Sequence, residues 1–301
     1  MGTLKSNGKT FLLQDVNHVY EIIQPTRLYL KDYEDIKIGP NEEVLIDTFT
    51  TPKIIAYGYG LSTIENVGTT GLQINFLLDG EEQPSNRIGF IDFITNNNLT
   101  MTNERFISHV EEKVGSFIIF TFPNNPIRWF KECKVSIMNW LDVSLVVNAM
   151  LIIGEPIELP ILNSIKRESM SEYKRSVRGG EDLIVASIKG YGRLVSIFVS
   201  VKGYSDEMKN FNIRVFGDDT DIPFMNITFN YMWKFFLNKS RIGNSFIGIG
   251  YVDDVNYIYS MWINFEPLKI YPYCTNYMEV HFRFPVDGEV TYTVIYDKIL
   301  I

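Results

Sequence analysis

Apolar and polar residues alternate along the chain in short stretches, which predicts β-strands rather than helices. Residues 72–78 and 211–217 alternate with a period of two, the spacing that brings side chains to one face of a pleated strand. Turn chemistry lies between such stretches, for example at Asp79-Gly80, Pro123-Asn-Asn-Pro126 and Asp287-Gly288. Only strands of about 5 to 9 residues fit between these turns. Residues 114–122 and 135–153 are apolar at successive positions, which predicts strands that are covered on both faces.

The chain contains an internal repeat. Three pairs of segments match at nearly one offset: 72–84 with 211–223 at 139, 53–57 with 193–197 at 140, and 126–133 with 267–274 at 141. The last match aligns Cys133 with Cys274. Because the offset is nearly constant over most of each half, we infer a duplicated domain of about 110 to 120 residues, a length that eight short strands fill.

These patterns predict an all-β fold of two tandem jelly-roll β-sandwiches, a double jelly roll. We expect an N-terminal arm at 1–42, a first jelly roll at 43–154, a linker at 155–182 and a second jelly roll at 183–301. Prolines extend the start of the linker, and residues 163–178 are polar enough for a short exposed helix before Gly179-Gly180.

Composition supports two folded cores and argues against a nucleic-acid-binding face. The 301 residues are 46% hydrophobic and rich in Phe and Tyr, which suits half-buried strands. The formal charge is −8, from 28 basic and 36 acidic residues, whereas phosphate binding depends on basic residues. A basic stretch does occur, but acidic Glu168 and Glu172 interrupt it, so we interpret it as a solvated linker; it consists of Lys166, Arg167, Lys174, Arg175 and Arg178.

The two cysteines and the first residues predict where the protein is made. Cys133 and Cys274 lack the paired spacing of a zinc site or a redox motif. Residues 1–10 lack the apolar core of a signal peptide, and no run of about 20 apolar residues follows. We therefore expect synthesis in a reducing cytoplasm.

No catalytic, cofactor-binding or metal-ligating residues are predicted. His18, His109 and His281 occur singly, and no nucleophile motif or phosphate loop is present. Two acidic groups could in principle serve glycoside hydrolysis or bind Ca²⁺. They are Asp79, Glu81 and Glu82 in the first half, and Asp218, Asp219, Asp221, Asp253 and Asp254 in the second. We favour a turn role, because aspartate bonds its own backbone in turns.

Aromatic residues have two possible roles, a sugar-stacking platform or core packing. Most of them alternate within strands, which favours the core: Tyr57, Tyr59, Trp129, Phe130, Trp140, Tyr231, Trp233, Trp262 and Tyr271. In Tyr57-Gly58-Tyr59-Gly60 the glycines lie beside aromatics, which suits a close backbone contact or a subunit interface.

The duplicated pattern at 72–84 and 211–223 resembles that of the double jelly-roll major capsid proteins of membrane-containing icosahedral viruses. The resemblance implies a self-assembling, non-enzymatic virion protein, made in the host cytoplasm, whose homotrimers form pseudo-hexagonal capsomers with lateral contacts. It also implies that the N-terminal arm ties neighbours, other virion proteins or an inner membrane. From the charge and the missing motifs we expect no direct nucleic-acid binding and no cofactor. The end of the chain, 297–301, is neither basic nor amphipathic, so we do not expect it to anchor in a membrane.

Two other classes of function remain open. A carbohydrate-binding protein or glycoside hydrolase with the same fold would place an acidic pair and aromatics in one pocket. A phage tail or receptor-binding protein would form elongated trimers.

Overall fold

The computed structural model describes residues 2–6, 9–15, 18–22, 26–51, 54–65, 71–80, 86–89, 107–112, 115–121, 126–157, 164–218, 222–243, 245–268 and 270–300. Within this part the chain forms 24 strands, one α-helix, α2 (Phe229–Phe235), and one 3-10 helix, η1 (Asp206–Asn210). The predicted all-β fold class is confirmed. None of the helices in these ranges is long and apolar enough to cross a bilayer.

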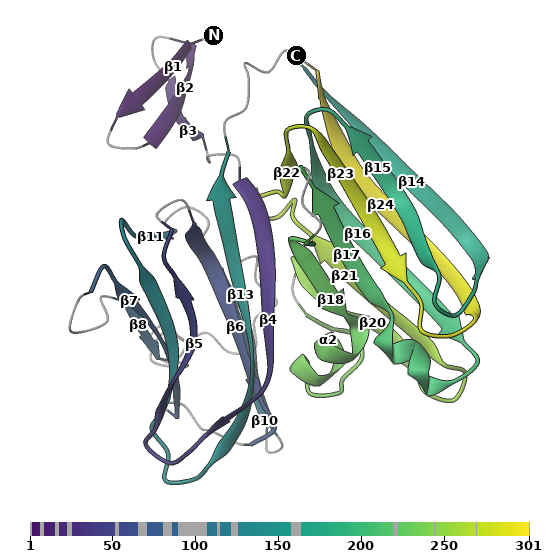
Figure 1. The fold of residues 1–301 in the computed structure, drawn as a ribbon, viewed down its shortest axis with the longest axis horizontal. Helices are drawn as coiled ribbons and strands as arrows, with labels where there is room; N and C mark the ends of the chain where they lie inside the picture. The colour runs from purple at the N-terminus through teal and green to yellow at the C-terminus, as the bar shows by residue number, and fades with distance from the viewer. Residues whose placement is uncertain are drawn as a thin grey trace.

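The first half of the chain forms a sandwich of two sheets (Figure 1). One sheet contains, in spatial order, β4 (Thr26–Ile38), β13 (Leu145–Pro156), β6 (Ile55–Thr63), β10 (Gly115–Thr121) and β9 (Ile107–Glu112), with β11 (Ile127–Arg128) paired to β6. The other contains β5 (Glu43–Phe49), β12 (Cys133–Asn139), β7 (Leu72–Leu78) and β8 (Asn86–Gly89). Side chains from both sheets, such as Tyr59, Phe76 and Val135, form one core between them.

The second half repeats this arrangement. One sheet contains β14 (Ser164–Val177), β24 (Gly288–Leu300), β16 (Gly192–Gly203), β21 (Ile258–Asn264), β20 (Ile247–Asp253) and β19 (Ile242–Gly243), with β22 (Tyr273–Cys274) paired to β16. The facing strands are β15 (Asp182–Lys189), β23 (Tyr277–Arg283), β17 (Asn212–Gly217) and β18 (Met225–Thr228).

The strand order identifies each half as a jelly roll. If β4, β5, β6, β7, β8, β10, β12 and β13 are counted one to eight, the sheets read 1-8-3-6 and 2-7-4-5. The strands β14, β15, β16, β17, β18, β21, β23 and β24 give the same two orders. This interleaving of two four-stranded sheets is the double Greek key of a jelly roll. The prediction of two tandem jelly rolls is confirmed.

The two jelly rolls are joined through the sheet that contains β4. Strand β18 lies parallel to β4, with Met225 beside Leu30, so the facing strands of the second half extend this sheet to ten strands. In Figure 1, α2 lies at the lower junction between the two halves, and its Tyr231 hydroxyl donates to the Ala149 carbonyl over 2.6 Å. Strand β13 is buried at eight consecutive positions, 147–154, because it has the first core on one face and the second jelly roll on the other. The predicted double covering of 135–153 is thereby confirmed for this strand.

Two predicted features of the connecting segments are wrong. Residues 164–177 form β14, not a short helix. This strand is exposed on both faces over most of its length, so its sequence lacks the alternation that marks a half-buried strand. In the predicted arm, residues 26–38 form β4 and pair with β13. Residues 2–22 contain β1 (Gly2–Ser6), β2 (Lys9–Asp15) and β3 (His18–Ile22), which form a separate three-stranded sheet.

The register of the strands also corrects the repeat. Cys133 pairs with Leu78, and Met278 pairs with Gly217. Since 72–84 and 211–223 keep their offset of 139 in β7 and β17, the equivalent of Cys133 is Met278 and not Cys274. The alignment of the two cysteines is wrong because the chain from Gly217 to Met278 is six residues longer than the chain from Leu78 to Cys133.

Candidate functional site

The first jelly roll has one sheet surface that the second jelly roll covers. This covered face is the side of β4, β13, β6 and β10 that points away from the first core. Its apolar side chains belong to the same hydrophobic cluster as the second jelly roll; they are Leu28, Leu30, Ile55, Tyr57, Phe117, Ile119, Met150 and Ile152. The Phe117 ring packs edge-on against Phe236, just after α2, with 5.1 Å between centroids.

The second jelly roll has an equivalent surface. We call it the exposed face, the side of β14, β24, β16 and β21 that points away from the second core. In the first jelly roll Ser62 lies between Asn148 and Phe117, and in the second Ser200 lies between Thr291 and Ser260. Both β6 and β16 also skip one residue against the neighbouring strand, at Tyr57 and at Val195. The two faces therefore correspond residue by residue.

The chemistry of the two faces differs. Phe117 and Met150 on the covered face correspond to Ser260 and Thr293 on the exposed face. Serine and threonine are polar and suit a surface that is open to water, whereas the apolar side chains of the covered face are buried by the second jelly roll. Two aromatic rings interrupt this polar surface. Phe198 is 42% exposed, and the Trp262 indole lies against Gly248, where a Cβ would collide with it. Both rings line a shallow hollow, together with Ser200, Gly250, Ser260 and Thr293 among others.

Strand β14 forms the edge of this face. In the described residues it pairs only with β24, so its other edge carries backbone groups open to a partner. Three large apolar side chains on this strand are exposed by 46% or more; they are Ile165, Met170 and Tyr173. An open edge strand of 14 residues can pair with another chain, and charged side chains on such an edge limit unspecific pairing. Strand β14 carries both signs of charge, with four basic and two acidic residues.

The predicted acidic turn residues hold turns. Asp79 and Asp218 both have positive φ, 54° and 52°. Asp79 accepts backbone N–H bonds from Phe130, Lys131 and Glu132, and Asp218 accepts them from Thr275 and Asn276. The Phe130 N–H and its two neighbours hold the pKa of Asp79 below its ordinary value. Burial acts to raise the pKa of Asp218, but Arg27 and the turn N–H groups outweigh it and lower that pKa.

The remaining acidic candidates are also engaged locally where the structure describes them. Asp253 accepts the backbone N–H groups of Val255 and Asn256 in the turn after β20. Asp254 pairs with Lys209 over 2.8 Å. Glu81, Glu82, Asp219 and Asp221 lie outside the described residues. A group of three or more His, Cys, Asp or Glu side chains placed to hold a metal ion is not found in the described part of the chain.

Most aromatic candidates lie in the core, as predicted. Tyr57, Tyr59, Trp129, Tyr231 and Tyr271 are buried, Trp233 and Trp262 are partly buried, and Phe130 and Trp140 are exposed. In β6, Tyr57 belongs to the cluster shared with the second jelly roll and Tyr59 to the first core. The glycine-aromatic segment thus lies at the contact between the two jelly rolls. The outward position of Phe198 was not evident from the sequence, because Ile197 and Val199 on either side of it are also apolar.

Of the histidine and cysteine candidates, the structure describes the side chains of His281, Cys133 and Cys274. His281 lies between Glu279 and Asp182, at 3.1 and 3.3 Å from their carboxylates, on the outer side of β23. The side chains of His18 and His109 lie outside the described residues. Cys133 and Cys274 are both buried and unpaired with each other.

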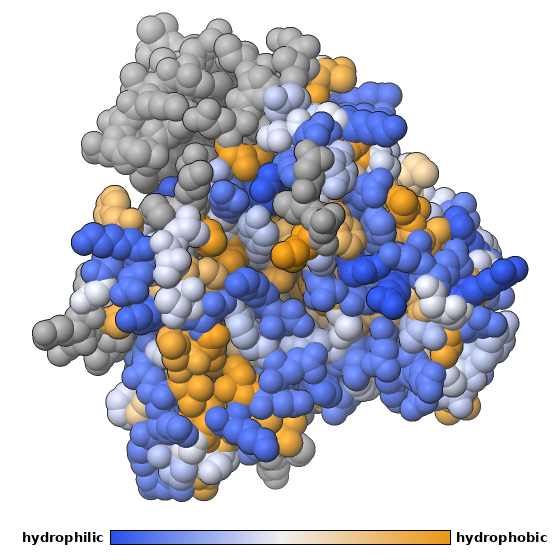
Figure 2. Space-filling model, viewed as in Figure 1, coloured by the Kyte–Doolittle hydropathy of each residue, from blue (hydrophilic) through white to orange (hydrophobic). Residues whose placement is uncertain are grey.

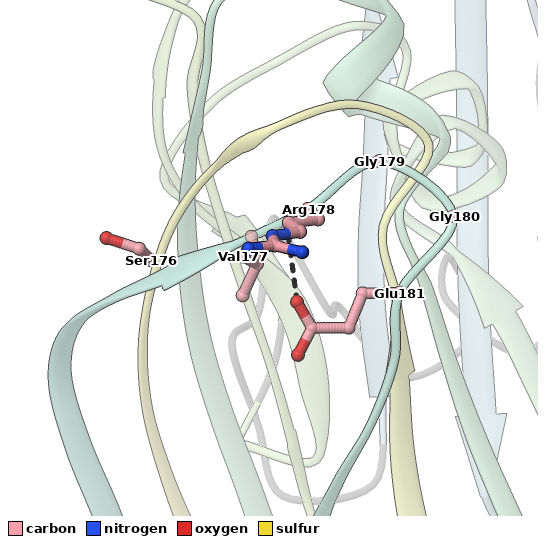
Figure 3. Close-up of a pocket in the computed structure, with 6 residues that line it drawn as sticks. All are labelled: Ser176, Val177, Arg178, Gly179, Gly180 and Glu181. Carbon is pink, nitrogen blue, oxygen red and sulfur yellow. Dashed lines mark hydrogen bonds between the residues drawn. The ribbon is translucent and has the colours of Figure 1, made fainter.

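Two other surface features are a hollow at a turn and a hydrophobic area on the first jelly roll (Figure 2). A hollow at the β14–β15 turn is lined by 176–181, and Figure 3 shows the bond that the Arg178 N–H donates to the Glu181 carboxylate at 2.9 Å. In Figure 2, hydrophobic surface gathers over the lower part of the first jelly roll, around β5 and β13. Leu45 in β5 and Val143 just before β13 are both more than half exposed.

Comparison with known proteins gives matches in structure alone. No protein-family model matches the chain, and no curated protein is similar to it in sequence. The fold is similar to that of the major capsid protein P2 from bacteriophage PM2, with 8% identity over 91% of this chain and 98% of that one and a TM-score of 0.27.

Two further solved structures match with similar identities and TM-scores. One is a chain from the structure of Sulfolobus turreted icosahedral virus, with 9% identity, 90% of each chain covered and a TM-score of 0.29. The other is the PBSX exported protein XepA, with 7% identity, 89% of this chain and 86% of that one covered and a TM-score of 0.26. The double jelly roll is shown by the strand order of the chain's own sheets, and the TM-scores of these matches with capsid proteins are too low to carry an argument about function.

Proposed function

We propose that this chain is a structural, self-assembling protein, a viral major capsid protein whose copies form trimeric, pseudo-hexagonal capsomers. One observation carries the proposal. The covered face of the first jelly roll is buried by the second jelly roll of the same chain, whereas the equivalent exposed face of the second jelly roll has no such cover among the described residues. In a duplicated fold, the surface that is buried within the chain on one jelly roll has an equivalent on the other jelly roll. Another copy of the chain can bury that equivalent surface in the same way.

The contact within the chain joins two unlike surfaces. The covered face of the first jelly roll meets α2 and β18 of the second, so the same contact made by the exposed face would recruit the first jelly roll of the next copy. A head-to-tail contact of this kind repeats until the ring closes. If each step turns by a sixth of a circle, six jelly rolls and therefore three chains close the ring.

The proposal extends to the virion. A capsomer wall needs large lateral surfaces and no catalytic chemistry, and the described carboxylates of the acidic groups are bonded to turns or to lysine. Residues 2–22, which form a sheet separate from both jelly rolls, are the segment we assign to contacts with neighbouring capsomers, other virion proteins or an inner membrane.

The second candidate is carbohydrate binding. Phe198 and Trp262 line a shallow hollow together with the hydroxyl groups of serine and threonine, and sugars stack on aromatic rings next to hydrogen-bonding side chains. This candidate predicts that a monomer binds an oligosaccharide through the exposed face, while the capsid proposal predicts that a second copy occupies that face.

A charged substitution on the exposed face tests the proposal. Phe198→Glu places a carboxylate where the next copy packs, so it should abolish trimers while the chain remains folded. Leu45→Glu is the matched control, because Leu45 is also an exposed apolar residue but lies on the first jelly roll, in β5. Sedimentation velocity should show monomers for Phe198→Glu and trimers for Leu45→Glu. Trimers in both variants, or a wild-type chain that binds oligosaccharide and remains monomeric, would overturn it.

A further inference from the structure

A largely buried ion pair joins the first strand of one jelly roll to the other jelly roll within the chain. Arg27 in β4 donates from Nη2 to Oδ2 of Asp218 over 2.7 Å. The Arg27 side chain is 18% exposed and that of Asp218 6%, so the pair is largely removed from water.

The internal repeat gives Asp218 a counterpart in Asp79. Both residues follow the fourth strand of their jelly roll, and both have positive φ. Each donates its own N–H to the carbonyl of the residue that enters the seventh strand, Glu132 or Tyr277. In both, Oδ1 accepts two or more backbone N–H groups and Oδ2 accepts one. In Asp218 the remaining capacity of Oδ2 is used by Arg27.

The repeat also gives Arg27 a counterpart in Lys166. Strands β4 and β14 pair with β13 and β24 in the same register, with Ile38 opposite Leu145 and Val177 opposite Gly288. Both strands bulge at a residue with φ of 51°, Asp35 or Lys174. The N–H of each bulge residue donates to a side-chain oxygen on the eighth strand, of Asn148 or Thr291. Counting from this bulge, the position of Arg27 in β4 is that of Lys166 in β14.

Neither counterpart has the corresponding partner within the chain. Lys166 is 66% exposed and contacts Glu168 on its own strand. An ion pair between Asp79 and a basic side chain is not seen in the part of the chain that the structure describes. The charges of the counterparts are nevertheless opposite, as in the buried pair.

We propose that Lys166 of one copy pairs with Asp79 of the next copy, in the contact between the exposed face and the neighbour's first jelly roll. This inference rests on the proposed head-to-tail assembly, and it assigns the two residues that align one copy against the next. It also places the open edge of β14 beside β8 of the next copy, as β4 lies beside β18 within the chain. Opposite charges at matching positions guide the encounter and fix the register of the two surfaces.

A carbodiimide, which joins an amine to a carboxylate without a spacer, tests the pair in the native protein. Lys166 and Asp79 should become linked in the band of two joined chains on a denaturing gel, as identified by peptide mass spectrometry. The positive control is Lys234 in α2 and Glu34 in β4, 3.3 Å apart within one chain, whose link should occur in the single-chain band. Trimers that lack the Lys166–Asp79 link between chains would overturn this inference and leave the proposed assembly intact, whereas a protein without trimers would overturn both.

Substitution of Lys166 gives a second readout and leaves the Asp79 turn undisturbed. Lys166→Glu should weaken trimer association about tenfold or more, because it sets two carboxylates against each other. Lys166→Arg should preserve trimers and remove the cross-link. Lys189→Glu is the control, since Lys189 is exposed on β15 in the other sheet. Equal association of the Lys166→Glu and wild-type chains would contradict the pairing.

Discussion

Arg27 and Asp218 lie 191 residues apart in the chain, and their side chains meet at 2.7 Å where the two jelly rolls join. Asp218 holds the turn before β23 through its backbone contacts, and Arg27 lies in the first strand of the other jelly roll. The same carboxylate therefore shapes a turn and fastens one jelly roll to the other.

Loss of the arginine should destabilise the chain. Arg27→Met leaves the carboxylate of Asp218 largely buried without its cation, and should lower the free energy of unfolding by about 2 kcal/mol at neutral pH. Lys31→Met is the control, because the Lys31–Asp47 pair is exposed and should contribute less than about 1 kcal/mol. Urea unfolding at one chain concentration measures the free energy of unfolding of both variants. Equal losses of stability for Arg27→Met and Lys31→Met would contradict the role of the Arg27–Asp218 pair.

The effect of Arg27→Met should depend on pH in one direction. The pKa of Asp218 is lowered in the folded chain, so the pair stabilises the fold above the pKa of an unfolded aspartate, about 3.9. This contribution is lost as the pH falls through the lower folded-state pKa. The difference in the free energy of unfolding between the wild-type chain and Arg27→Met should thus be constant near neutral pH and shrink below about pH 4. A difference that grew with acid would contradict the assigned cause.

The repeated aspartates provide a matched pair of substitutions. Asparagine retains an oxygen for the turn N–H groups and tolerates positive φ, so Asp79→Asn should disturb its turn only slightly. Asp218→Asn also removes the charge that faces Arg27 and should be the more destabilising of the two. Thermal unfolding in the monomeric Phe198→Glu background compares them without a contribution from assembly. An Asp79→Asn chain that unfolds at the lower temperature would reverse the prediction.

The two cysteines should be inert while the chain is folded. Burial raises the pKa of both Cys133 and Cys274 to about 12, so almost no reactive thiolate exists near neutral pH. Labelling with a thiol reagent at pH 8 should be slow for the native protein and rapid, with two sites, in urea. Rapid labelling of the native protein at either cysteine would show that its surroundings open.

Much of the fold was predictable because the repeat preserves alternation and turn chemistry together. The stretches 72–78 and 211–217 alternate in both copies, and each ends at an aspartate that needs a turn. These signals are local, so they survive in the sequence and gave the all-β class, the duplication and the turn role of Asp79 and Asp218.

The remaining features depend on contacts distant in the chain. Strand β14 is exposed on both faces, so its polar sequence is typical of a solvated helix, and only its pairing with β24 makes it a strand. The two cysteines were aligned because both follow a proline and several apolar or aromatic residues. This similarity in sequence does not show which residues pair across the strands, so the alignment was wrong. The exposed face could not be predicted, since its importance comes from its comparison with a surface that the second jelly roll covers.

The mass of the native protein tests the assembly of three chains most directly. Native mass spectrometry over a range of dilutions should give three times the chain mass of 34.8 kDa, and electron microscopy of the same sample should show closed particles with six lobes. A mass of one chain at every concentration would contradict the proposed capsomer, and with it the pairing of Lys166 and Asp79 between copies.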